Sequence, residues 1–149
     1  MKTNEISQDN YMLCSKNRIV QFFGLTENHN SFVLNYNGNT FYNKREDVSQ
    51  ILMNENWHNI FGVKKNGFGS FEYKLPNNNN FDLVIVFSDD YIYLRQPNDK
   101  HSYNDSLITI WNNDLKRRTI YVSEFQNLFK SLSSIDLVAD LELLNKFNK

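Results

Sequence analysis

One pair of charged residues has a spacing found in metal-dependent nucleases. Glu72 and Lys74 lie in a run that alternates apolar and charged residues, so both side chains are expected on one face of a strand. In such nucleases the carboxylate holds Mg²⁺ and the lysine neutralises charge on the attacking water or the phosphate. Any strand with one solvated face shows the same alternation, and Asp47, a conceivable second ligand, falls in a predicted helix. We therefore interpret the pair as a solvated strand face and keep a small metal-dependent nuclease as an alternative.

The histidines and the single cysteine form no recognisable catalytic or metal-binding pattern. His29, His58 and His101 are far apart in the sequence, and none has the spacing of a metal-ligand motif. Cys14 lies beside apolar residues, where a free cysteine usually behaves as a small buried hydrophobe. A lone cysteine cannot form an internal disulfide, which favours a reducing compartment. We expect a cytoplasmic protein with no catalytic residue, no metal site and no cofactor.

Phosphate and nucleic-acid sites are not indicated either. The glycines at 67 and 69 precede a predicted strand, whereas phosphate loops lead into a helix. Sixteen basic residues against seventeen acidic ones give a net charge of -1, without the basic excess of a protein that neutralises phosphates. The one basic cluster, Lys116-Arg117-Arg118, fits the protection of an edge strand, with a small phosphate-contact patch as the alternative. We expect no direct contact with nucleic acid.

Acidic and aromatic residues recur in and beside the predicted turns of the second half of the chain. Turns at one end of a meander can form a single surface, where tyrosine and tryptophan serve as hot spots and acidic groups steer a basic partner. Aspartate also favours turns for local reasons, and tyrosine suits strands. The candidate partner-binding residues are Asp89, Asp90, Tyr91, Tyr93, Asp99, Tyr103, Asp105, Trp111 and Asp114.

A meander of antiparallel strands is predicted to position these residues. Asn37-Gly38 separates two runs rich in β-formers, the pattern of a hairpin with a type I′ turn. The apolar run 81–87 is expected at the centre of the sheet because a buried strand tolerates no polar face. The remaining strands are predicted at 70–75, 91–94, 107–111 and 119–122.

Helices are predicted at both ends of the chain. Apolar clusters at 11–13 and 19–23 indicate a helix ending near Gly24, and a capping pattern at Asn43 and Glu46 indicates a short one at about 44–55. Ser123 is expected to cap a C-terminal helix, and a second is expected from Ser133 or Ser134, with Val138, Leu141 and Leu144 on its apolar face. The predicted fold class is α+β: an antiparallel meander of about six strands with an N-terminal helix and two C-terminal helices packed on it. Residues 1–149 are expected to form one domain, with residues 1–10 flexible.

Composition and element order together resemble a family of inhibitors. The chain has 24 asparagines and a single alanine, and no window is long and apolar enough to span a membrane or direct export. In size, composition and strand-then-helix order it resembles the small immunity proteins of bacterial contact-dependent inhibition and other polymorphic toxin systems. Residues 81–132 carry the resemblance, with the runs 81–87 and 91–94 and the helix around Phe125 and Leu128.

The resemblance implies a non-enzymatic binding protein whose partner is a cognate protein toxin, commonly a nuclease. Such a protein covers the toxin's active site or an exosite and needs no chemistry of its own. A basic partner would match the acidic turn residues. The alternatives are a phage or mobile-element inhibitor of a host defence protein, a small metal-dependent nuclease using Glu72 and Lys74, and a module that binds a small ligand. The oligomeric state is not predicted.

Overall fold

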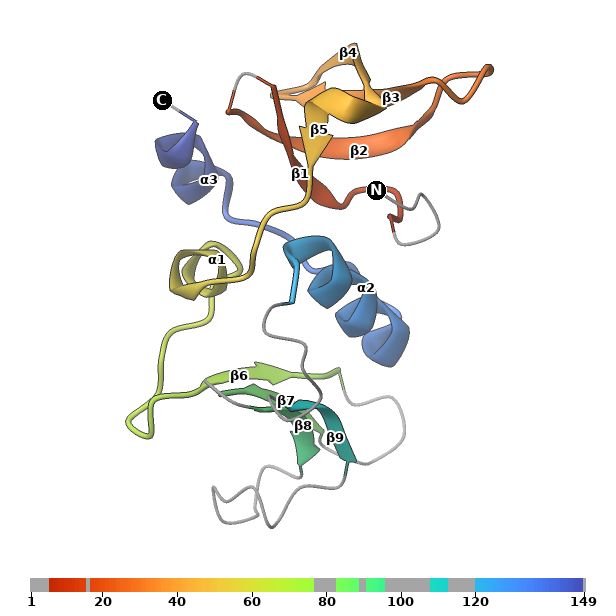
Figure 1. The fold of residues 1–149 in the computed structure, drawn as a ribbon. Helices are drawn as coiled ribbons and strands as arrows, with labels where there is room; N and C mark the ends of the chain where they lie inside the picture. The colour runs from red at the N-terminus through yellow and green to blue at the C-terminus, as the bar shows by residue number, and fades with distance from the viewer. Residues whose placement is uncertain are drawn as a thin grey trace. The chain divides into compact units, whose positions relative to one another are not determined.

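The computed structural model describes residues 6–15, 17–76, 83–88, 91–95, 108–112 and 120–148, with the backbone alone described at 108–112. Its contacts divide the chain into two compact units, residues 1–60 with 119–149 and residues 61–118. Antiparallel sheets and helices are segregated along the chain (Figure 1), which confirms the α+β class. The single meander of about six strands is wrong, because the described strands form two sheets, of five and four strands.

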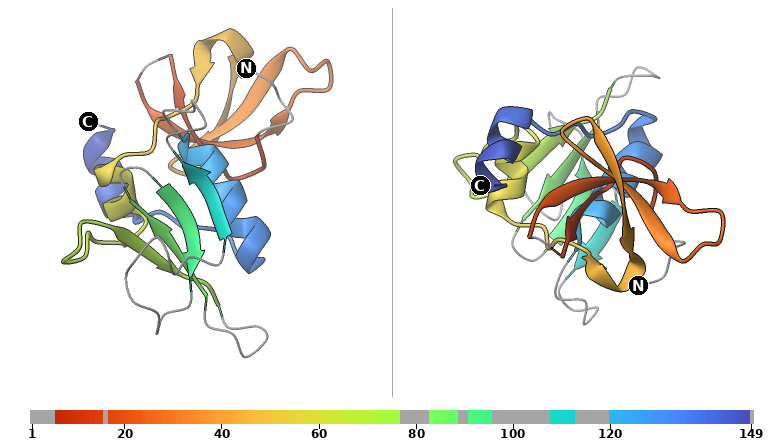
Figure 2. Two further views of the ribbon diagram at one scale, coloured as in Figure 1. Left: turned by 60° about the horizontal axis from the view of Figure 1, so that its bottom comes forward. Right: turned by 90° about the horizontal axis from the view of Figure 1, so that it is seen from above.

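The first unit contains the five-stranded sheet, in the order β4-β3-β2-β1-β5. Four strands form a meander, and after a 3-10 turn at Arg45–Asp47 the short fifth strand returns to pair with β1. Figure 2 shows the twisted course of these strands. The strands are β1 (Tyr11–Cys14), β2 (Ile19–Leu25), β3 (Ser31–Tyr36), β4 (Asn39–Lys44) and β5 (Val48–Ser49). One face of the sheet encloses a core of Met12, Cys14, Val20, Phe22, Phe32, Leu34 and Val48.

The predicted N-terminal helix is wrong, because the residues expected to form it lie in β1 and β2. Val20 and Phe22 are buried while Ile19 and Gln21 are only partly buried, which is the period of two that a strand produces. The clusters of apolar residues were compatible with both periods. Pairing of Met12 with Val20 in an antiparallel ladder decides between them.

The predicted hairpin is confirmed. β3 and β4 are joined by Asn37 and Gly38, and Tyr36 pairs with Asn39 across the turn. Both turn residues have positive φ, 50° at Asn37 and 82° at Gly38, as a type I′ turn requires. Asparagine and glycine are the residues that adopt this conformation at least cost.

The helix predicted at 44–55 is wrong. Residues 45–49 form the 3-10 turn and β5, and helix α1 (Glu55–Ile60) begins only where the predicted helix ends. The intervening backbone bonds to a distant segment: Met53 N–H donates to Ile120 O at 2.9 Å, and Val122 N–H donates to Ile51 O at 2.8 Å. These long-range bonds replace those of a local helix. The strand predicted at 119–122 is likewise reduced to one bridge between Leu52 and Tyr121 in the described residues.

Two C-terminal helices are present, as predicted, with different beginnings. Helix α2 (Val122–Ser133) starts two residues early, so Ser123 lies inside it, is fully buried and accepts a hydrogen bond from Gln50 Nε2 at 3.2 Å. Glu124 Oε2 instead accepts from the backbone N–H of Tyr121. Helix α3 (Leu141–Phe147) starts well after Ser134, capped by Asp140, whose Oδ1 accepts from the N–H groups of Glu142 and Leu143.

The second unit contains the four-stranded antiparallel sheet, in the order β6-β7-β8-β9. The predicted central position of the apolar run is confirmed: Val84, Ile85 and Val86 are all buried, so both faces of β7 are covered. The turn before β6 is held by Asn66 Oδ1, which accepts from the N–H groups of Phe68 and Ser70 at 3.0 Å each. The strands are β6 (Phe71–Lys74), β7 (Val84–Phe87), β8 (Tyr91–Arg95) and β9 (Ile108–Asn112).

Candidate binding surface

Most of the acidic and aromatic residues predicted to bind a partner lie outside the described residues. Of the three aromatic ones within them, Tyr93 is only 6% exposed and packs with Val84 and Val86, and Tyr91 packs against the same cluster. Trp111 is paired with Ile92 through its backbone. Convergence of these residues into one surface therefore stays a prediction. Those outside the described residues are Asp89, Asp90, Asp99, Tyr103, Asp105 and Asp114, as is the basic cluster Lys116-Arg117-Arg118.

Glu72 is held in a structural ion pair. Its Oε1 lies 2.9 Å from Arg95 Nη2 and 3.0 Å from Asn66 Nδ2, and the Arg95 side chain is 2% exposed. Lys74 is exposed on the same face of β6. A carboxylate oxygen that already accepts two hydrogen bonds is poorly suited to hold Mg²⁺, whereas a buried arginine requires an anionic partner. This geometry favours the structural interpretation of the Glu-x-Lys pair.

Cys14 is found in the core as expected, whereas His58, expected like the other histidines in a surface loop, is buried in a helix. Cys14 is 3% exposed within the core of the five-stranded sheet, as the sequence predicts. His58 is 2% exposed in α1, with its ring centroid 6.4 Å from that of Phe125. Burial lowers the pKa of His58 from its ordinary 6.5 to about 3, so its imidazole is neutral at physiological pH. His29 lies in an exposed turn, and His101 lies outside the described residues.

The clearest surface feature is an apolar stretch near the C-terminus that sequence reasoning missed. Val138 is 72% exposed and Leu141 65% exposed, although both were expected on the buried face of a helix. Only Leu144 of that predicted face is buried. Five large hydrophobic side chains are exposed in this stretch, which we call the C-terminal apolar segment: Leu132, Ile135, Val138, Leu141 and Phe147.

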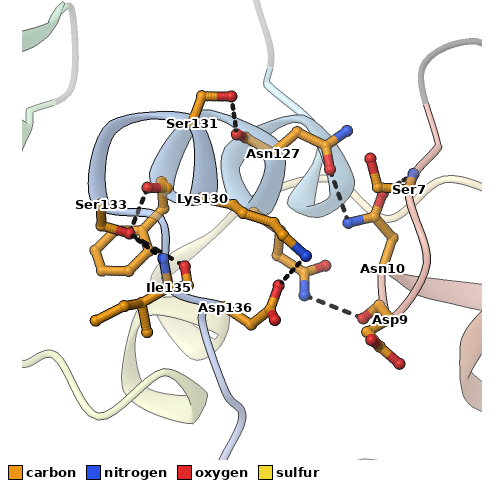
Figure 3. A network of polar contacts seen from close by, with 11 residues as sticks. Ser7, Asp9, Asn10, Asn127, Lys130, Ser131, Ser133, Ile135 and Asp136 are labelled. Atoms are coloured by element: carbon orange, nitrogen blue, oxygen red, sulfur yellow. Dashed lines mark hydrogen bonds and ion pairs between the residues drawn. The ribbon is translucent and has the colours of Figure 1, made fainter.

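The segment is fixed at its beginning by the end of α2 (Figure 3). Ser134 adopts the left-handed conformation with φ of 59°, which stops the helix. The Ser133 hydroxyl donates to Phe129 O at 2.7 Å and accepts from the Ile135 N–H at 3.1 Å. Lys130 Nζ lies 2.7 Å from Asp136 Oδ1, and this hydrogen bond raises the pKa of Lys130.

The rest of the segment is anchored by its backbone and by one small side chain. Asp140 N–H donates to Ile60 O at 2.7 Å, and Ala139, the single alanine of the chain, is 4% exposed. Apolar side chains therefore project from a backbone that is tied down on both sides. Asp140 and Glu142 are exposed beside them and Lys146 follows one turn later in α3, so these three residues leave one net negative charge.

A polar cavity of about 220 Å³ lies beside the start of this segment. Asn10 closes part of it: its Nδ2 donates to Asn127 Oδ1 at 3.1 Å, and its Oδ1 accepts from the Ser7 N–H at 2.7 Å (Figure 3). Residues 7–10, expected to be flexible, are thus tied to α2. Lys130 and Asp136 line the cavity and form an ion pair with each other, and Asp9 adds a further acidic residue to its wall.

The described residues show neither a metal centre nor a membrane-spanning helix. No three histidine, cysteine or acidic side chains of the described chain gather as metal ligands. No helix in the described ranges is long and apolar enough to cross a bilayer. No protein-family model, curated protein or solved structure matches this chain.

Proposed function

We propose that this chain is a non-enzymatic binding protein that neutralises a cognate protein toxin, in the manner of the immunity proteins that its sequence resembles. The observation that carries the proposal is the exposure of large hydrophobic side chains on a fixed backbone in the C-terminal apolar segment. Exposed apolar groups of this kind mark protein interaction sites, and anchors that are ordered before binding lose little entropy in a complex.

The charges around the segment suggest the character of the partner. Asp140 Oδ1 accepts from two backbone N–H groups, neither Asp140 nor Glu142 forms an ion pair within the described residues, and the two flank the exposed Leu141. An apolar centre with an acidic border suits a basic partner, because complementary charge speeds association and rejects acidic competitors. A toxin that cleaves nucleic acid is itself expected to be basic, because it must bind the phosphates of its substrate.

Co-purification from the native host tests the proposal. The tagged protein is captured at moderate salt, and whatever remains bound is identified by mass spectrometry and then expressed on its own. We expect one basic protein in a one-to-one complex that inhibits growth alone and is harmless when this chain is co-expressed. Recovery of no such toxin, or a toxin whose effect this chain does not relieve, would overturn the proposal.

Substitutions then test the role of the segment. Replacing both Val138 and Leu141 by serine removes two exposed anchors and leaves the buried Ala139 and Leu144 in place. We expect the affinity for the captured toxin to fall about 100-fold, since each lost anchor typically costs about 1–2 kcal/mol. Phe68→Ser is the matched control, because Phe68 is 73% exposed against 72% for Val138 and belongs to the other unit. Equal losses in both variants would contradict the assignment.

A further inference from the structure

The outer strand of the five-stranded sheet has a free edge in the described part of the chain. β4 pairs with β3 alone, at the end of the strand order β4-β3-β2-β1-β5. Because Tyr36 and Asn39 flank a two-residue turn, they exchange both of their backbone hydrogen bonds, and the pattern then alternates along the ladder. The N–H and C=O groups of Thr40, Tyr42 and Lys44 therefore point away from β3, at the edge of the sheet.

This edge lacks the devices that usually prevent another strand from pairing with it. β4 is six residues long and contains no proline, and the bulge of this sheet lies between β2 and β3. Its single charged residue is Lys44, at its last position. Thr40 and Tyr42 are exposed, Tyr42 by 68%, so a new strand could approach the outward groups.

A cavity of about 450 Å³ adjoins the same edge. Its wall combines aromatic rings with asparagine amides and one cation, Arg18. The Arg18 guanidinium carbon lies 5.3 Å from the centre of the Tyr36 ring, so a cation–π contact orients its N–H donors. Arg18 makes no ion pair with any described carboxylate. The lining residues are Cys14, Ser15, Arg18, Tyr36, Asn39, Phe41, Tyr42 and Asn43.

We propose that β4 is a docking strand for an extended segment of another protein, which pairs with the outward backbone groups and places a carboxylate side chain in the cavity against Arg18. Strand addition gives affinity through main-chain hydrogen bonds and specificity through pockets for alternate side chains. Arg18 favours an acidic segment, whereas the charge of Lys44 is partly compensated by Glu46, whose Oε1 lies 3.8 Å from Lys44 Nζ. A second copy of β4 fits less well, because its only charged residue is a lysine and it offers Arg18 no carboxylate.

This site goes beyond the proposed function, since it uses other residues than the C-terminal apolar segment and its test does not need a toxin. The full-length protein is used to select binders from a displayed library of random ten-residue peptides. We expect the enriched peptides to share one aspartate or glutamate flanked by alternating β-forming residues. Hydrogen exchange followed by NMR should show that Tyr42 N–H exchanges rapidly in the free protein and is protected when a peptide is bound. Phe41 N–H, which points towards β3, should be protected in both states.

Two variants and one control locate the contacts. Thr40→Pro removes an outward N–H that the β3–β4 ladder does not use and leaves every side chain of the cavity wall in place. Arg18→Gln removes the cation from an exposed position. Each is expected to weaken binding of the selected peptides at least tenfold, whereas Thr40→Val, which keeps the N–H, should bind as the wild type does. Thermal melts check that the variants fold, and Arg18→Gln remains decisive if Thr40→Pro does not.

The proposal would be overturned by a selection that enriches no peptide, by binding that survives Arg18→Gln, or by peptides in which glutamine replaces the acid without loss. Self-association of the wild type that Thr40→Pro abolishes would assign the edge to a second copy and also overturn it. Toxin capture through the C-terminal apolar segment would be unaffected by any of these results, so the two proposals can fail separately.

Discussion

At the scale of single residues, the ion pair between Glu72 and Arg95 gives a direct test of the two interpretations of the Glu-x-Lys pair. Glu72→Gln removes the anion that faces a side chain only 2% exposed, and we expect a loss of about 3 kcal/mol in the free energy of unfolding. Lys74→Ala, at an exposed position on the same strand face, should change stability by less than about 0.5 kcal/mol. Urea denaturation measures both values.

The alternative nuclease function predicts the opposite results for the same two variants. If Glu72 held Mg²⁺ and Lys74 neutralised phosphate, both substitutions would abolish a Mg²⁺-dependent cleavage. Glu72→Gln would then be as stable as the wild type, because it would leave no buried cation without its anion. A cleavage activity lost equally in both variants, with wild-type stability, would contradict the structural interpretation.

His58 should make stability depend on pH in a definite direction. Its folded pKa of about 3 lies below the unfolded value of 6.5, so below pH 6.5 the unfolded state binds a proton that the folded state rejects. The free energy of unfolding should therefore fall as the pH drops from about 6.5 towards 3, by up to about 1.4 kcal/mol per pH unit. Above pH 6.5 the residue contributes no pH dependence.

Denaturation between pH 7 and 5 measures this dependence before the carboxylates titrate. The difference in stability between the wild type and His58→Gln should narrow as the pH is lowered, because glutamine has no proton to bind. His29→Asn, in an exposed turn, controls for the loss of a histidine as such. A difference that stays constant from pH 7 to 5 would show that His58 is not held neutral by burial.

At the scale of elements, the β3–β4 turn is where local sequence alone determines the backbone. Gly38 has φ of +82° and open space around the position of a Cβ, so Gly38→Ala meets backbone strain and no clash. We expect it to destabilise the protein by about 1 kcal/mol. Asn37→Gly, which relaxes the other positive-φ position, should be close to neutral, and a Gly38→Ala variant as stable as the wild type would contradict the type I′ assignment.

The difference between elements fixed by local sequence and elements fixed by distant partners explains which of them could be predicted from the sequence. The hairpin, the strands β6 to β9 and the existence of α2 follow from short-range signals: turn residues, alternation and an apolar face. The N-terminal helix and the helix at 44–55 were wrong because distant partners decide those segments. Met12 pairs with Val20 in a ladder, and Ile51 bonds to Val122, more than 70 positions along the chain.

The candidate site was missed for a related reason. Val138, Leu141 and Leu144 are spaced three apart, which predicts one buried helical face, but Ser134 and Asp140 break the segment into a helix end, a connection and a new helix. Asp140, an N-cap residue followed by helix formers, was the available signal for that break. Exposure itself depends on what packs nearby, and no local pattern encodes it.

At the scale of the whole molecule, the division into two units raises the question of whether they unfold together. The first unit is discontinuous in sequence, and residues 61–118 are inserted between its two parts. Chain connectivity couples such units weakly, because leaving the insert unfolded inside a folded unit costs only the entropy of a longer loop. Fewer than 60 residues is also a size at which a separate core is marginal.

Because an insert of fewer than 60 residues is marginally stable on its own, we predict, as the chain length suggests, that the whole chain unfolds in one cooperative transition. The two tryptophans are suited to test this, because Trp57 lies in α1 of the first unit and Trp111 in β9 of the second. Trp111→Phe leaves a fluorescent probe in the first unit alone, and Trp57→Phe leaves one in the second. In urea, the fluorescence transition of each variant should coincide with its own far-UV circular dichroism transition. A fluorescence midpoint that precedes the circular dichroism midpoint in one variant and follows it in the other would show two independently folding units, and the single domain expected from the sequence would be wrong.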